Sequence, residues 1–335
     1  MVLIAILGDR QTRLGDEAKP FYLFVIAGLL LSPLAVSEGI KDLFLTFAGV
    51  SVALLIQIPK VRIWNVFWVI LAGFVVENVV YGNFHGGFKW DISNSESSFE
   101  GNFGFMFALL TSFALMQRRY RLVILSILLS VLALKRIALL AEIGVIFFYW
   151  IGERRGKLIL NSPVMVFLNL LLIVIVVSYS TGQFNQIITQ LTGQSANQFG
   201  QGRQEIQAVP SREIIAHPLN FIFVGKGSGA SYELATKGFG SKNQKTNLHS
   251  DLLKLVYEYG FLFFMAFIWL MYSSRSYNTR LAFLLMNILF LTDNVLIYYF
   301  LIFFLVVCIR LFAVDEKSAS PVTGFKQSII SKAGT

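Results

Sequence analysis

The sequence predicts an all-α polytopic membrane protein, with about ten transmembrane helices and one long extracytoplasmic loop. Of its 335 residues, 56% are hydrophobic and only 14% are charged, whereas a soluble protein is about 25% charged. The apolar runs are long and continuous, which indicates spanning helices rather than the short alternating strands of a barrel. We attribute the net charge of +9 mostly to basic cytoplasmic loops, so nucleic-acid binding is not expected.

The N-terminus shows no cleavable signal, because residues 1–7 form too short an apolar run and residues 8–19 are charged. The first spanning helix is therefore expected to direct insertion into the membrane. The lone cysteine, Cys308, lies in an apolar run and rules out an intramolecular disulfide.

Lysines and arginines orient the spans, because short cytoplasmic loops are enriched in these residues. Residues 1–19 carry three of them, so the N-terminus is expected in the cytoplasm. The first four spans then alternate outward and inward, and the loop 82–98 lies outside. These predicted spans are residues 21–37, 40–58, 64–81 and 99–116.

The apolar run 122–151 is interrupted only by Lys135, Arg136 and Glu142, and both of its flanks are basic. If both flanks are cytoplasmic, the run crosses twice, as a hairpin of two short helices with Lys135 and Arg136 near its outer tip. The alternative is one long helix with this charged pair near the middle of the bilayer, which is costly. We favour the hairpin.

The remaining spans are residues 162–180, 250–273 and a second double pass over 281–311 that turns at Thr292-Asp293-Asn294. Ten crossings place both termini in the cytoplasm. The chain divides into an N-terminal bundle of about seven helices, an outer loop, C-terminal helices and a polar tail that is expected to be disordered. These parts cover residues 1–180, 181–248, 249–313 and 314–335.

The outer loop is more basic than acidic, which suggests an anionic ligand outside the membrane. Within it, Arg203 and Arg212 are nine residues apart, and arginine binds phosphate oxygens in a bidentate manner. The alternative is that the two arginines are solvated charges that pair with Glu205 and Glu213.

His249 stands at the start of the apolar helix predicted for residues 250–273, beside Asn247, Ser250 and Asp251. Its neighbours are typical helix caps, but capping does not explain the histidine. An imidazole can accept a proton near neutral pH, and the helix N-terminus beside it attracts anions. The alternative is an interfacial histidine without a chemical role.

Other polar residues stand at the hairpin tips and inside the apolar helices. Two adjacent cations such as Lys135 and Arg136 are costly unless they face a cavity, water or an anion, although they could also extend to the interface. Asp293 is either a helix cap or a cavity wall. Glu258 lies well inside its predicted helix and is expected to face the bundle.

The glycines Gly225, Gly227 and Gly229 could cradle an anion with backbone amides or simply form a flexible turn. Their segment is not a P-loop, since G-x-x-x-x-G-K-S/T is absent. The histidines have no metal-ligand spacing, so we expect no metal site.

Four segments together resemble the O-antigen polymerase and O-antigen ligase superfamily, which includes the Wzy-type polymerases. They are G-R at 202–203, F-V-G-K-G-S-G over 223–229, L-A-L-K-R-I-A-L-L over 132–140 and N-L-H-S-D-L-L-K-L-V-Y-E-Y-G-F over 247–261. The last is similar to the family pattern H-N-x-x-L-x-x-L-x-E-x-G. Ser250 replaces the commoner asparagine after the histidine, and Ile206 stands near a position that is often aromatic, so the subfamily is left open.

The resemblance implies a GT-C-like glycosyltransferase without metal or cofactor. It would act on the outer face of the bacterial cytoplasmic (inner) membrane, where glycan is transferred from undecaprenyl diphosphate to a sugar hydroxyl. His249 would be the base, and the diphosphate would be bound by Arg203, Arg212, Arg136 and Lys135. Asp251, Glu258, Asp293 and the three loop glycines would support the site.

We expect a polymerase of lipid-linked oligosaccharide repeat units that makes O-antigen, capsule or exopolysaccharide. The alternatives are an O-antigen ligase that moves polymer onto lipid A core, and a transporter or flippase of lipid-linked oligosaccharide. The expected partners are the undecaprenyl-diphosphate-linked substrate, membrane lipid and a chain-length regulator protein.

Overall fold

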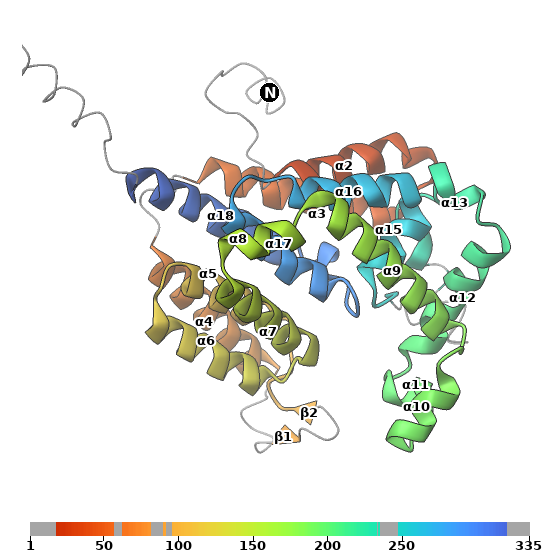
Figure 1. Cartoon of the computed structure of the whole chain (residues 1–335), viewed down its shortest axis with the longest axis horizontal. Coiled ribbons are helices and arrows are strands. Elements are labelled where there is room, and N and C mark those ends of the chain that lie inside the picture. Colours follow the sequence, from red (N-terminus) through yellow and green to blue (C-terminus); the bar gives the residue numbers. More distant parts are fainter. Residues whose placement is uncertain are drawn as a thin grey trace, which may run out of the picture.

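The structure is a computed structural model that describes residues 18–56, 62–81, 90–91, 96–232, 234 and 247–319. Apart from the two-residue antiparallel strands β1 (Trp90–Asp91) and β2 (Glu96–Ser97), the regular elements of the described chain are helical (Figure 1). This confirms the all-helical part of the predicted fold.

The helices of the first half follow the predicted spans closely in several places. The predicted span 162–180 has the same bounds as α9, whereas the span 21–37 is divided between α2 and the 3-10 helix η1, in which Pro33 stands in the first turn. These elements are α2 (Lys19–Leu30), η1 (Ser32–Leu34), α3 (Ser37–Leu55), α4 (Ile63–Val80), α5 (Phe103–Met116), α6 (Tyr120–Ala133), α7 (Arg136–Ile151), α8 (Glu153–Ile159) and α9 (Ser162–Ser180).

The second half begins with short helices inside the predicted outer loop. They are α10 (Asn185–Thr192), α11 (Ala196–Phe199), α12 (Arg203–Ala216) and α13 (Asn220–Phe223). The chain then forms α15 (Asp251–Tyr259), α16 (Phe261–Tyr272), α17 (Tyr277–Leu289), the 3-10 helix η3 (Val295–Ile297) and α18 (Tyr299–Ala319). Because α18 continues to Ala319, the start of the tail predicted to be disordered is helical. The rest of that tail lies outside the described residues.

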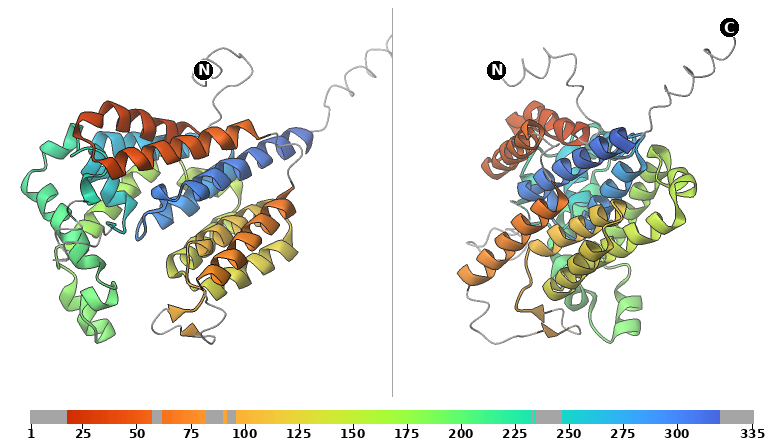
Figure 2. Two further views of the ribbon diagram at one scale, coloured as in Figure 1. Left: turned by 180° about the vertical axis from the view of Figure 1, so that it is seen from behind. Right: turned by 90° about the vertical axis from the view of Figure 1, so that its left-hand side faces the viewer.

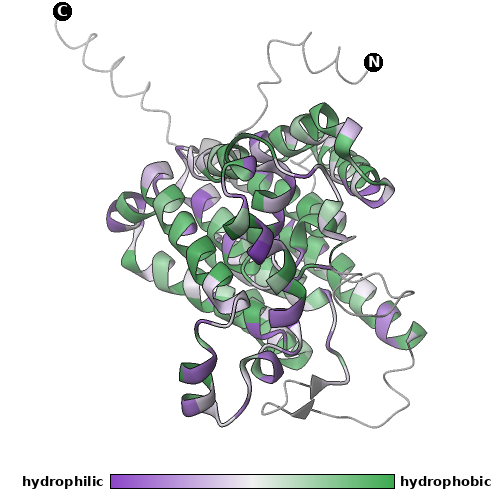
Figure 3. Ribbon diagram, turned by 90° about the vertical axis from the view of Figure 1, so that its right-hand side faces the viewer, coloured by the Kyte–Doolittle hydropathy of each residue, from purple (hydrophilic) through white to green (hydrophobic). Residues whose placement is uncertain are grey.

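Two described helices, α4 and α9, are long and apolar enough to cross a membrane. Large apolar side chains are also exposed across the bundle, including Leu55, Phe167 and Trp150, the last at 84%. Figure 3 shows hydrophobic residues on most of the bundle and hydrophilic residues concentrated on the short helices that extend below it. Exposed apolar surface of this extent marks a contact with membrane or protein, and the fold is compatible with a helical membrane protein.

The run 122–151 is divided into α6 and α7, as the hairpin interpretation predicts. The break falls at Leu134, which has a left-handed φ of 48°, and at Lys135. Ser130 Oγ donates a hydrogen bond of 2.7 Å to Glu142 Oε1. In a continuous helix these residues would lie about 18 Å apart, so the chain folds back on itself. The predicted turn at Thr292–Asn294 likewise separates α17 from α18.

The prediction of one helix over 250–273 is wrong, because the chain breaks at Gly260 into α15 and α16. Gly260 has a φ of 88°, which a residue with a side chain rarely adopts. The carbonyls of Tyr257 and Glu258 at the end of α15 accept hydrogen bonds from the amides of Lys226 (2.9 Å) and Gly227 (3.0 Å). The amides of residues 226 and 227 therefore bind the last carbonyls of α15. In a continuous helix, the amides of the next helical turn would bind these carbonyls.

The helices from the two ends of the chain share one hydrophobic core. Helix α18 packs on α3, α16 packs on α2 and α9, and α17 packs on α7. Figure 2 shows α18 and the N-terminal helices side by side in both views. The predicted division between residues 1–180 and 249–313 is therefore a division of the sequence and not of the core.

We expect Gly260→Ala to destabilise the protein more than Gly152→Ala. The two glycines share one backbone conformation, with φ of 88° and 84° and ψ of 166° and 164°. An added methyl group at Gly260 would lie 3.0 Å from the carbonyl oxygen of Phe221, whereas at Gly152 nothing lies within 4 Å. Both variants should lose about 1–3 kcal/mol to backbone strain, and Gly260→Ala should lose more. Thermal unfolding in detergent measures this, and equal melting temperatures would contradict it.

Candidate functional site

One pocket of about 520 Å³ brings together residues from distant parts of the chain. Its charged lining comes from Lys135 and Arg136 at the tip of the α6–α7 hairpin, Arg203 of α12, Glu100 before α5 and Asp293 after α17. Its apolar lining continues along α7 and α9, through Ile137, Leu140, Leu172, Ile175 and Val176. The pocket thus offers positive charge beside an apolar wall.

Among the three cations that line this pocket, Lys135 is the one that lies beside carboxylates of the described residues. Its Nζ lies 3.6 Å from a carboxylate oxygen of Glu100 and 3.9 Å from one of Asp293, and 5.5 Å from the centre of the Phe105 ring. These contacts hold the hairpin tip against the turn that follows α17. Asp293, for which the sequence left a cap or a cavity wall open, lines the pocket and also accepts the amide of Asn294 at 2.8 Å.

Arg136 and Arg203 form no ion pair with any residue that the structure describes. Arg203 is the first residue of α12, directly after Gly202, whose φ of 81° turns the chain into the helix. Both guanidinium groups are therefore available to an anion in the pocket.

The structure does not bring Arg212 to the pocket. Arg203 and Arg212 both belong to α12, and nine residues turn a helix by about 900°, which places them on opposite faces. Arg212 is exposed. The alternative pairing with Glu213 is also wrong, because that carboxylate accepts Lys226 Nζ and Tyr257 Oη, each at 2.6 Å.

His249 precedes α15 and lies in a fixed backbone geometry. Its φ is 52°, and its carbonyl oxygen accepts a hydrogen bond of 3.0 Å from Gln207 Nε2. Ser250 is the helix cap, since its Oγ accepts the amide of Leu253. The Nδ1 atom of His249 is buried and has no hydrogen-bond partner in the described part of the chain. The backbone at His249 is therefore fixed, while its Nδ1 atom has no partner among the described residues.

Burial lowers the pKa of His249 below its ordinary value of 6.5. The negative charge of Asp293 opposes this shift, while the positive charges of Arg203 and Lys135 add to it. Gln207, which donates to the His249 carbonyl, lines the pocket, whereas His249 itself is not among the described residues that line it. At neutral pH the ring is uncharged and can accept a proton.

The glycine segment 225–229 is built into the fold, and none of its residues is among the described residues that line the charged pocket. Two of its amides, those of Lys226 and Gly227, donate to the end of α15, and the carbonyl of Ser228 accepts the amide of Val36. A methyl group on Gly225 would lie 2.3 Å from the carbonyl carbon of Glu258. The glycines are thus required for close packing.

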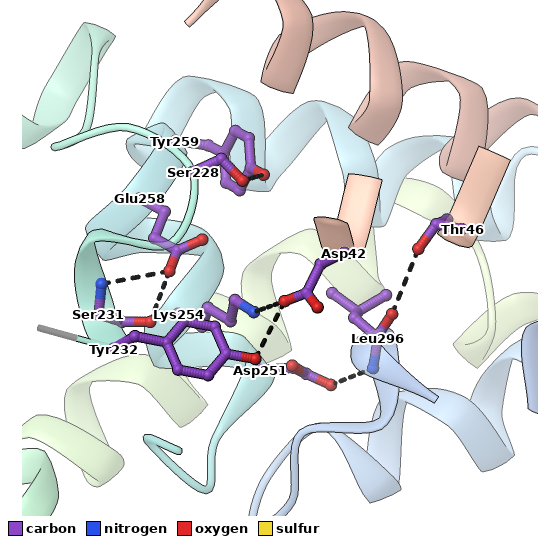
Figure 4. A network of polar contacts seen from close by, with 10 residues as sticks. All are labelled: Asp42, Thr46, Ser228, Ser231, Tyr232, Asp251, Lys254, Glu258, Tyr259 and Leu296. Carbon is purple, nitrogen blue, oxygen red and sulfur yellow. Dashed lines mark hydrogen bonds and ion pairs between the residues drawn. The ribbon is translucent and has the colours of Figure 1, made fainter. Parts of the chain in front are cut away.

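Asp251 and Glu258 are completely buried on one face of α15 (Figure 4). Asp251 Oδ2 accepts the amide of Leu296 at 2.8 Å, and Glu258 Oε1 accepts the amide and hydroxyl of Ser231. Neither residue lines the charged pocket. They connect α15 to the segments around it.

Sequence reasoning missed two groups of residues. Gln207 holds the His249 carbonyl by a hydrogen bond. The sequence did not predict the helix over residues 203–216 to which Gln207 belongs, so nothing singled it out. Lys254 pairs with Asp42 at 3.4 Å in the centre of the bundle. Its signal was the spacing of Asp251, Lys254 and Glu258, which places three charges on one helical face.

Comparison of the chain with protein-family models, curated proteins and solved structures finds no match. The resemblance to O-antigen polymerases and ligases therefore rests on the motifs quoted from the sequence.

We expect the imidazole of His249 to titrate below pH 6.5 in the full chain. Asp293→Asn should move the midpoint lower still, because it removes the negative charge that raises the pKa. Asparagine keeps an oxygen to accept the amide of Asn294. Nuclear magnetic resonance of labelled histidine measures both midpoints, with His249→Gln to assign the signal. A rise in the midpoint of Asp293→Asn would show that the carboxylate does not act on this ring.

Proposed function

We propose that the protein is a membrane glycosyltransferase that polymerises lipid-linked oligosaccharide repeat units on the outer face of the bacterial cytoplasmic membrane. The observation that carries this proposal is the pocket in which Lys135, Arg136 and Arg203 lie beside an apolar wall. Such a lining suits a ligand with a phosphorylated head and an apolar chain. The motifs that resemble O-antigen polymerases supply the more specific class of undecaprenyl diphosphate.

The charges in the pocket suit a diphosphate. Lys135 is more than balanced by the two carboxylates of Glu100 and Asp293, whereas Arg136 and Arg203 have no acidic partner among the described residues. Two guanidinium groups can each bind phosphate oxygens in a bidentate manner. As the glycosidic bond breaks, negative charge grows on the departing diphosphate, and cations already in place stabilise it without rearrangement.

The transfer step needs a base, and His249 is the proposed base. The oxygen of an acceptor hydroxyl attacks the anomeric carbon of the donor sugar as the bond from that carbon to the diphosphate oxygen breaks. The electron pair of this bond leaves with the lipid diphosphate, and the imidazole takes the proton of the hydroxyl. Burial keeps the ring neutral before the reaction, because it lowers the pKa of His249.

In the proposed topology the chain crosses the membrane ten times with both termini in the cytoplasm. The spanning candidates α4 and α9 support it, as do shorter apolar helices such as α5, α6 and α16. The fold-back at Leu134 supports two short crossings over 122–151. This topology places the hairpin tip, α12 and His249 together on the outer side.

We expect His249→Ala and Arg203→Ala to abolish long polymer in cells, whereas Arg212→Ala should retain it. Loss of a base or of one charge-stabilising donor slows such reactions by about 100-fold or more. Arg212 is the matched control, because it is an exposed arginine on the opposite face of the same helix. Gel electrophoresis of the polysaccharide, with membrane expression of each variant verified, measures chain length.

Normal chains from well-expressed His249→Ala and Arg203→Ala cells would refute the proposed site. A deletion strain separates the polymerase from its alternatives. Single lipid-linked repeat units should accumulate in it, while accumulation of lipid-linked polymer would identify a ligase instead. Transport of lipid-linked sugar by reconstituted vesicles without glycan transfer would identify a flippase.

A further inference from the structure

A second pocket, of about 420 Å³, lies beside the first two turns of α3. No residue that lines it also lines the charged pocket, so the two are separate cavities. All of its lining side chains are polar, in contrast to the apolar walls of the charged pocket. They are Ser37, Glu38, Lys41, Asp42, Tyr232 and Asn247.

Asp42 is held rigidly in this polar pocket. Its Oδ2 accepts hydrogen bonds from Tyr232 Oη at 3.0 Å and from Lys254 Nζ at 3.4 Å (Figure 4). Lys254 is 3% exposed and also lies 5.1 Å from the centre of the Tyr232 ring. No described residue donates a hydrogen bond to the other oxygen, Oδ1. A fixed carboxylate with one oxygen still able to accept is a recognition element for a hydroxyl donor.

The charged side chains that line the polar pocket are Glu38, Lys41 and Asp42, and Asp42 is paired with the buried ammonium group of Lys254. The charged pocket is lined by two arginines, whereas no arginine is among the described residues that line the polar pocket, so the polar pocket suits a polyphosphate less well. A neutral ligand with many hydroxyls can instead donate to the carboxylates and accept from Lys41 and Asn247. The polar lining is therefore suited to a sugar.

The polar pocket lies next to the proposed base. Asn247 lines it and is two residues before His249, so their Cα atoms are at most about 7 Å apart. The charged pocket approaches the same histidine through Gln207, which lines that pocket and donates a hydrogen bond to the His249 carbonyl. We propose that the polar pocket is the subsite for the acceptor sugar, which presents its hydroxyl from one side of the 247–249 segment. This assignment rests on the proposed function.

The test uses the full chain in lipid nanodiscs and the free monosaccharides glucose, galactose, mannose, rhamnose and N-acetylglucosamine. Saturation-transfer difference spectroscopy detects sugar contact, and calorimetry with inorganic pyrophosphate reports the charged pocket. Glu38→Gln and Lys41→Ala should each weaken the sugar signal about tenfold, as expected for loss of a hydrogen bond to a charged group. Asp42→Asn should do the same. Arg203→Ala should keep the sugar signal and lose pyrophosphate binding.

The variants at Glu38 and Lys41 keep the test decisive if Asp42→Asn fails to fold, because Lys41 is exposed and Glu38 is half-buried. Absence of a signal from all five sugars, or a signal that these variants leave unchanged, would overturn the subsite. So would a sugar signal lost in Arg203→Ala, since the sugar would then occupy the charged pocket. Sugar binding without pyrophosphate binding would support the sugar subsite and count against the proposed function. The converse result would overturn the subsite alone.

Discussion

The contacts of the Lys254 ammonium group are the interactions on which the centre of the structure depends. This group is buried, pairs with Asp42 of α3 and lies against the ring of Tyr232, so it connects three segments distant in sequence. An ion pair taken out of water gains little net stability, but removal of one partner leaves an uncompensated charge and costs about 3–5 kcal/mol. The pair thus acts mainly as a constraint, because α15 cannot slide or rotate against α3 without separating the two charges and leaving them unpaired.

This constraint explains how a short helix can hold a histidine in a strained position. At its start, α15 is fixed by the Ser250 cap and by Asp251, which accepts the amide of Leu296. At its end, the amides of the glycine segment occupy its last carbonyls. A left-handed residue costs about 1–3 kcal/mol and persists only where the surroundings determine it. His249 meets that condition, with Gln207 holding its carbonyl.

Hydropathy and charge predicted the helical class, the bounds of α9 and the fold-back at Lys135, because each leaves a local mark in the sequence. The break at Gly260 leaves none, since the apolar character continues across it and the capping amides come from a segment more than thirty residues earlier. The sequence pattern also did not predict α12, because its segment is polar. It therefore could not show that Arg203 and Arg212 lie on opposite faces of one helix. The pairing of Lys254 with Asp42 joins residues 212 positions apart, which no local pattern encodes.

Under the proposed function, the apolar wall along α7 and α9 lets the substrate approach the pocket from within the lipid. A molecule whose chain stays in the lipid reaches the pocket by diffusing in two dimensions, so its number per area of membrane determines occupancy. Confinement of this kind raises the effective concentration, as tethering does. A modest affinity for the head group then suffices, and weak binding favours rapid exit. The spent carrier leaves sideways into the leaflet from which it came, and no step requires the chain to enter water.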